Sequence, residues 1–204
     1  MKTLLIVDVQ YDFLPGGALE VPEGDKIIDG INEIQDKFDL IVATQDWHPE
    51  GHFSFASGHE GKDPFDKISL DNGKEQILWP DHCVQGSKGA EISKDLNTNK
   101  IQAIIRKGTN PKIDSYSGFY DNFKEKNTGL TGYLEDREVF DLYICGLAGD
   151  FCVYFTAMDA KDEGFNTFYI EDLTRPIDQE GFEEAKNEME KGDIKIIKSK
   201  NLDW

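Results

Sequence analysis

The chain has 204 residues, with 22 Lys or Arg against 40 Asp or Glu, so its formal net charge is −18. This acid excess argues against nucleic acid and anionic membranes as partners, and the apolar runs are far shorter than the roughly 20 residues of a membrane-spanning helix. A hydrophobic fraction of 38% is enough for a packed core, so we expect one globular domain over residues 1–204.

Cysteine usage and the N-terminus bear on the compartment. Three cysteines are too few for a disulfide scaffold and fit a reducing environment. The first apolar run is interrupted by Asp8 and no small-residue cleavage site follows, which is unlike a secretory signal. We therefore expect a cytoplasmic protein. The sequence leaves open whether the chain forms a homo-oligomer.

Short apolar runs alternate with amphipathic segments along the chain. The runs are rich in Ile, Val and Leu and are nearly continuous, as strands buried on both faces of a parallel sheet are. In chain order the expected elements are strand 3–9, helix 25–38, strand 40–44, strand 101–105, strand 139–145, helix 151–163, strand 167–170, helix 178–191 and strand 194–197. This order predicts a doubly wound α/β fold, a mostly parallel six-stranded sheet with helices on both faces.

Two long segments, 45–100 and 107–137, interrupt the alternation and are rich in Gly, Pro, Asp and Asn. Loops of this length in a compact domain are usually functional or disordered. Both begin where strands end, and ligands of open α/β sheets bind outside the carboxyl ends of the strands. We expect the functional site at that edge.

The first long segment contains side chains that suit a metal ion. Asp46 and His48 are two residues apart, so in extended chain they point to the same side. A carboxylate and an imidazole together suit a divalent ion such as zinc, iron or manganese. An isolated pair of this kind is more often a surface hydrogen bond, but His82 offers a third ligand. His52 stays open as a fourth ligand or as a partner of a ligand.

Among the three cysteines, Cys152 is best placed to act as a nucleophile. It falls in the first turn of a predicted helix, where unpaired amides and the helix dipole favour a thiolate. One helix terminus supplies about 0.3–1 kcal/mol, less than the roughly 2.7 kcal/mol of a two-unit shift in thiol pKa. A nearby Lys107 ammonium would add to this effect, and Asp8 would accept the proton. Taken alone, each also fits an ordinary role, a loop carboxylate or a lysine reaching water.

Seven short motifs stand at these strand ends and in the long segments. They are D-V-Q-x-D-F at 8–13, T-Q-D-W-H-P at 44–49, H-F-S-F-A at 52–56, W-P-D-H-C-V at 79–84, K-G-T at 107–109, D-S-Y-S-G-F at 114–119 and G-L-A-G-D-F-C-V at 146–153. In this order they resemble the nicotinamidases, also called pyrazinamidases, of the isochorismatase-like cysteine hydrolases. The resemblance extends from Lys2 to Asp178.

The resemblance implies roles for the residues near the predicted nucleophile. By it, Asp8, Lys107 and Cys152 form a catalytic triad. It also implies a cis peptide bond before Ala148, whose amide joins that of Cys152 in an oxyanion hole.

The resemblance further implies a metal site and a substrate pocket. Asp46, His48 and His82 would bind one divalent metal ion, zinc in the first place, with iron or manganese as alternatives. Phe13 would stack on the pyridine ring of the substrate, and Trp79 would line the pocket.

The implied reaction is hydrolysis of nicotinamide to nicotinate and ammonia through a thioester, in NAD salvage, with pyrazinamide as a further substrate. The nearest alternative is a cysteine amidase for an N-carbamoyl, ureido or other aryl amide compound. A vinyl ether hydrolase fits less well because that chemistry uses no cysteine, and a non-catalytic metal-binding protein is a further alternative. The family often has Thr, Tyr and Asp where this chain has Gly149, Phe151 and Asn110.

Overall fold

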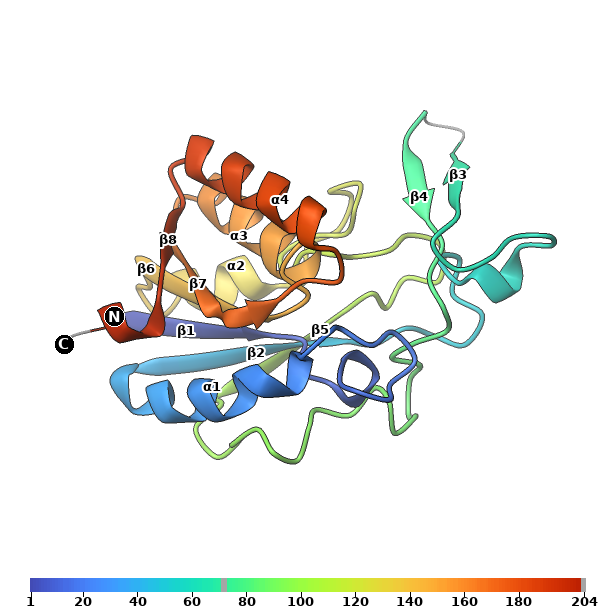
Figure 1. The fold of residues 1–204 in the computed structure, drawn as a ribbon. Helices are drawn as coiled ribbons and strands as arrows, with labels where there is room; N and C mark the ends of the chain where they lie inside the picture. Colours follow the sequence, from blue (N-terminus) through green and yellow to red (C-terminus); the bar gives the residue numbers. More distant parts are fainter. Residues whose placement is uncertain (71–72, 203–204) are drawn as a thin grey trace.

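A six-stranded, wholly parallel sheet is the centre of the molecule (Figure 1). The computed structural model describes residues 1–70 and 73–202. The strand order is β5-β2-β1-β6-β7-β8. The strands are β1 (Lys2–Val7), β2 (Leu40–Asp46), β5 (Ala103–Lys107), β6 (Asp141–Leu147), β7 (Asn166–Arg175) and β8 (Lys195–Ile197). The doubly wound α/β fold predicted from the sequence is confirmed.

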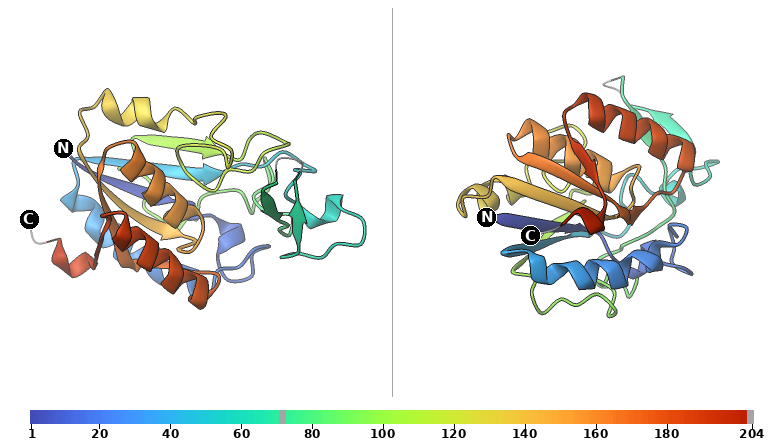
Figure 2. Two further views of the ribbon diagram at one scale, coloured as in Figure 1. Left: turned by 90° about the horizontal axis from the view of Figure 1, so that it is seen from above. Right: turned by 60° about the vertical axis from the view of Figure 1, so that its left-hand side comes forward.

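Helices cover both faces of this sheet (Figures 1 and 2). They are α1 (Ile28–Ile34), α2 (Leu130–Glu135), α3 (Cys152–Asp162) and α4 (Gln179–Lys191). Successive side chains of a strand point to opposite faces, so Leu4 and Ile6 of β1 pack in the core cluster with α1. Leu5 and Val7 pack in a second cluster with the other three helices. This two-sided burial is the reason that the apolar runs are continuous.

Several element boundaries differ from the sequence-based expectation. The expected helix 25–38 is a short α1 flanked by two 3₁₀ turns, Gly24–Ile27 and Gln35–Lys37. A glycine and several β-branched residues make this stretch a weak helix former. Strands β2 and β5 each extend two residues further than expected, to Asp46 and Lys107, which pair side by side.

The long segments also contain small elements that the sequence did not reveal. A two-stranded hairpin of β3 (Lys67–Ser69) and β4 (Glu75–Ile77) stands apart from the main sheet, and α2 lies in the second segment. Elements of three to six residues are too short to show a period. Parts of both segments, the β3–β4 hairpin among them, lie beyond the carboxyl ends of the strands (Figure 1), where the site was predicted, whereas α2 lies back along the sheet.

The C-terminal helix begins and ends where the sequence predicted. The side chain of Asp178 accepts a hydrogen bond from the Gly181 amide at 2.6 Å, and Gly192 follows the last helical residue. Asp178 is therefore the N-cap of α4. None of the helices in the described part of the chain is both long and apolar enough to cross a membrane.

Candidate active site

Three strand and helix ends bring Asp8, Lys107 and Cys152 together. The Lys107 Nζ atom lies 3.0 Å from Asp8 Oδ2 and 3.4 Å from Cys152 Sγ. All three side chains are buried, and Cys152, the most accessible, is 8% exposed. The structure therefore brings together the three residues to which the sequence assigned a triad. Their catalytic roles remain a prediction.

The surroundings of the Lys107 ammonium hold it in place. It also contacts Asp46 Oδ1 at 3.1 Å and donates to the Ser115 carbonyl at 2.9 Å. Asp8 follows β1 with a positive φ of 49°, which turns the chain away from the sheet. Thr44 Oγ1 donates to Asp8 Oδ1 at 2.7 Å. One oxygen of the Asp8 carboxylate thus accepts from the Thr44 hydroxyl, and the other contacts the Lys107 ammonium.

Burial and charge set the protonation states in this cluster. Burial opposes the charge on Lys107, but Asp46 and Asp8 outweigh it and raise the pKa of Lys107 well above its usual value. Burial raises the pKa of Asp8 although Lys107 opposes this, which makes the carboxylate a stronger base.

The Cys152 thiol differs from the sequence-based expectation. A helix terminus and a lysine predicted a lowered pKa, but burial, together with Asp8 and Asp46, raises the pKa of Cys152 well above its usual value against the effect of Lys107. Desolvation exceeds the modest contribution of one helix terminus. The sulfur therefore carries its proton in this environment and needs a neighbouring base.

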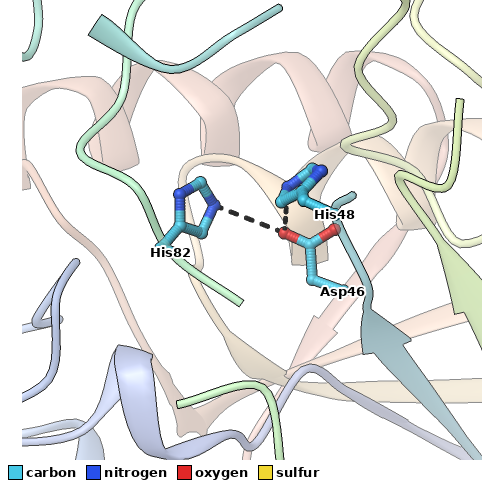
Figure 3. Close-up of side chains that lie close together, drawn as sticks. All are labelled: Asp46, His48 and His82. Carbon is cyan, nitrogen blue, oxygen red and sulfur yellow. Dashed lines mark ion pairs between the residues drawn. The ribbon is translucent and has the colours of Figure 1, made fainter. Parts of the chain in front are cut away.

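Asp46, His48 and His82 converge beside the cluster from two separate segments (Figure 3). Asp46 Oδ2 lies 2.9 Å from His48 Nε2 and 3.4 Å from His82 Nε2. All three side chains are buried. The sequence predicted this set, and the structure shows that its ligand atoms are close enough to share one ion.

The other ring nitrogens of the two histidines show that the set suits a metal ion. His48 Nδ1 lies 3.0 Å from the Gly108 carbonyl and His82 Nδ1 lies 2.8 Å from the Pro80 carbonyl. Since a carbonyl only accepts, each Nδ1 carries a proton, and each Nε2 can offer its lone pair to a cation lying beside Asp46. Among the described residues, His48 Nε2 is buried without a hydrogen-bond partner. A divalent cation at this point would satisfy all three groups.

Gly108 lets the chain approach this site closely. It has a φ of +66°, and a Cβ atom there would lie 2.6 Å from His48 Cε1 and 2.7 Å from Asp46 Oδ1. A larger residue would displace a predicted ligand. This accounts for the glycine of the K-G-T motif.

His52, which the sequence left open, has both ring nitrogens engaged. Its Nδ1 lies 2.8 Å from Ser54 Oγ and its Nε2 lies 2.8 Å from the Asn110 carbonyl. The carbonyl requires a proton on Nε2, so Nδ1 accepts from Ser54. The His52 ring packs against His48, with centroids 4.3 Å apart. His52 in this arrangement supports a predicted ligand and offers no free lone pair of its own.

A small pocket opens over Cys152 and over two of the predicted metal ligands, Asp46 and His82. Phe13 and Trp79 line it, as predicted. Aromatic walls of this kind suit a small planar ring. The sequence analysis assigned no role in the pocket to five further lining residues, because single loop residues have no diagnostic spacing: Leu19, Asp114, Tyr116, Phe151 and Ile177.

The backbone next to the sulfur has the features that the resemblance implied. The Leu147–Ala148 peptide bond is cis, and Ala148 lines the pocket. Helix α3 starts at Cys152, so its first amides lack helical partners. Within the part of the chain that the structure describes, neither the Ala148 nor the Cys152 amide donates to a protein acceptor. Both amides remain available to an oxyanion.

A thiol, an ammonium and a carboxylate in contact, at the carboxyl edge of a parallel α/β sheet, are the equipment of a cysteine hydrolase. The isochorismatase domain model matches residues 2–200. The chain belongs to the isochorismatase-domain family.

Several curated relatives that match most of the chain are named nicotinamidases. The nicotinamidase of Acinetobacter baylyi is 48% identical, covering 98% of this chain and 93% of the relative. The nicotinamidase of Escherichia coli is 45% identical, covering 86% of this chain and 84% of the relative.

Solved structures with a similar fold include nicotinamidases and pyrazinamidases. The Acinetobacter baumanii nicotinamidase/pyrazinamidase has a TM-score of 0.96 at 47% identity, covering 98% of this chain and 97% of that one. PnC1 of L. infantum in complex with nicotinate has a TM-score of 0.86 at 40% identity, covering 98% and 93%. The pyrazinamidase of Pyrococcus horikoshii in complex with zinc has a TM-score of 0.79 at 42% identity, covering 97% and 98%.

Proposed function

We propose that this chain, acting as one domain over residues 1–204, is a nicotinamidase that hydrolyses nicotinamide to nicotinate and ammonia. The observation that carries the proposal is the contact of Lys107 with both Asp8 and Cys152 beneath a pocket with aromatic walls. Curated nicotinamidases that are up to 48% identical to this chain support the proposal. The reaction would serve NAD salvage in the cytoplasm, and pyrazinamide would be a second substrate.

The first half of the reaction forms a thioester. Asp8 takes the thiol proton as Cys152 Sγ bonds to the carboxamide carbon, and the carbonyl electron pair moves onto oxygen. The amides of Ala148 and Cys152 bind this oxyanion, each contributing about 2.7–4 kcal/mol to the barrier reduction. Asp8 then gives its proton to the nitrogen, the C–N bond breaks and ammonia leaves.

The second half regenerates the thiol. Asp8 accepts a proton from water, whose oxygen attacks the thioester carbon, and the same two amides bind the oxyanion again. The C–S bond then breaks, Asp8 returns its proton to the sulfur, and the acid leaves and loses its proton to water as nicotinate. Throughout, Lys107 remains charged and keeps the carboxylate and the sulfur in contact.

The proposed metal ligands are Asp46, His48 and His82, with zinc as the ion and iron or manganese as alternatives. A bound divalent ion supplies a Lewis-acid contact for the pyridine nitrogen. The zinc in the Pyrococcus horikoshii structure supports this choice. Phe13 and Trp79 both line the pocket; Phe13 would stack on the ring, and Trp79 would help to exclude water.

The test is release of ammonia and nicotinate from nicotinamide by wild type, Cys152→Ala and Cys145→Ala. Cys145 is a matched control because it is also buried but lies inside β6, outside the pocket. We expect Cys152→Ala to lose activity by a factor of 10³ or more, and Cys145→Ala to retain it. Equal rates for wild type and Cys152→Ala would contradict the proposal. Ammonia from an N-carbamoyl compound but not from nicotinamide would favour the alternative amidase.

A further inference from the structure

The Gln10 side chain is fully buried and does not line the pocket, yet it makes four polar contacts. Its Oε1 accepts from the Asp46 amide at 2.7 Å, and its Nε2 donates to the Asp46 carbonyl at 2.8 Å. The same Nε2 lies 2.9 Å from the Ala90 carbonyl and 3.3 Å from Cys83 Sγ. One side-chain amide therefore binds both backbone groups of Asp46.

The pairing of β2 in the sheet explains why Gln10 binds the Asp46 backbone. The ladder between β1 and β2 ends at the pair of Ile6 and Ala43, because β1 ends and Asp8 turns away with a positive φ. One edge of Asp46 is thus left without a strand partner, whereas its other edge is paired with β5 at Lys107. The Gln10 amide has one acceptor and a donor, as a peptide group has, and it takes the place of the missing strand.

Asp46 needs to be held accurately because its two oxygens have different partners. Oδ2 faces His48 and His82, and Oδ1 contacts the Lys107 ammonium. Movement of the Asp46 backbone would disturb both sets of contacts. The residue after His82 is Cys83, whose sulfur also contacts Gln10.

We propose that Gln10 is a positioning residue for the metal site, which fixes the backbone of Asp46 and so the carboxylate that His48 and His82 face. The inference rests on the proposed metal site. Because Gln10 follows Asp8 by two residues, the same short segment carries the proposed base and aligns the metal ligands with it. Removing the amide would weaken metal binding although no ligand is changed.

The test measures the zinc affinity of chelator-stripped, full-length protein by competition with a coloured chelator. Gln10→Met keeps the length of the side chain but loses every hydrogen bond, and Gln10→Asn keeps an amide that is too short to reach Asp46. Gln45→Met is the matched control. Gln45 is also buried and donates to the same Ala90 carbonyl at 2.9 Å, but its side chain does not bind Asp46. Circular dichroism and melting of the metal-free proteins report folding separately.

We expect both Gln10 variants to bind zinc about 10–100-fold more weakly than wild type, as is usual for residues that orient metal ligands. Gln45→Met should bind zinc like wild type. The inference is overturned if folded Gln10 variants keep the wild-type dissociation constant, or if Gln45→Met loses as much affinity. If Gln10→Met does not fold, the more conservative Gln10→Asn decides. Failure of wild type itself to bind zinc would instead contradict the proposed metal site.

Discussion

The Lys107 ammonium lies 3.1 Å from Asp46 Oδ1 while it also touches Cys152 Sγ at 3.4 Å. One buried cation therefore joins the proposed nucleophile to a proposed metal ligand. The register of the sheet produces this contact, since Lys107 and Asp46 are paired residues on neighbouring strands. A change in charge at the proposed metal site would therefore alter the electrostatic environment of the Cys152 sulfur, and the reverse also holds.

The first prediction concerns Lys107. Lys107→Met would leave Asp8 and Asp46 buried without their shared cation, and removing one partner of a buried ion pair costs about 3–5 kcal/mol. We expect the free energy of unfolding to fall by that amount and nicotinamide hydrolysis to be lost. Denaturant unfolding of the metal-free protein measures the first effect. Lys186→Met, which breaks an ion pair nearer the surface, should cost less than about 1 kcal/mol. Equal stability of Lys107→Met and wild type would show that the cluster is not ionised as described.

The second prediction concerns the reactivity of the Cys152 thiol in metal-free protein. Its pKa is raised, so the thiolate fraction, and with it the rate of alkylation by iodoacetamide, should still increase as the pH passes 9.0, the usual thiol value. Mass spectrometry of the Cys152 peptide measures this rate. Asp8→Asn removes a negative charge that raises the thiol pKa, so it should move the profile to lower pH. A plateau near neutral pH would contradict the assignment.

The third prediction distinguishes His82, a predicted metal ligand, from His52, which supports a ligand. His82→Ala removes a predicted ligand and should weaken zinc binding by more than about 100-fold, beyond the usual effect of a supporting residue. His52→Ala should cost much less, because both His52 nitrogens are hydrogen-bonded elsewhere. Zinc content after dialysis measures both variants. Equal loss in the two would make His52 a ligand.

The fourth prediction concerns the N-cap of α4. Asp178→Ala removes the acceptor for the Gly181 amide and should lower the free energy of unfolding by about 1 kcal/mol. Asp178→Asn keeps an acceptor oxygen and should cost less. Urea unfolding compares the three proteins, and nicotinamide hydrolysis should stay unchanged. No difference between Asp178→Ala and wild type would exclude a stabilising cap.

The fold was predictable where a long-range pattern was present. The continuous apolar run from Leu4 to Val7 predicted a strand buried on both faces, and both faces are covered by helices. Helix α2 and the β3–β4 hairpin were not predicted because each is shorter than two periods of a helix or a strand. The two 3₁₀ turns that flank α1 were predicted as part of one α-helix, because their apolar residues also have helical spacing.

The order of motifs along the chain was sufficient to propose which residues act, because residue types such as an Asp-x-His pair and a cysteine at a helix start carry their chemistry with them. The sequence by itself also determined the sheet and the edge at which the site forms. Only the tertiary structure decided the charge state of the Cys152 thiol, the two hydrogen bonds that engage His52 and the contact between Gln10 and Asp46. These depend on burial and on distances between segments far apart in the chain, and neither quantity is contained in local spacing.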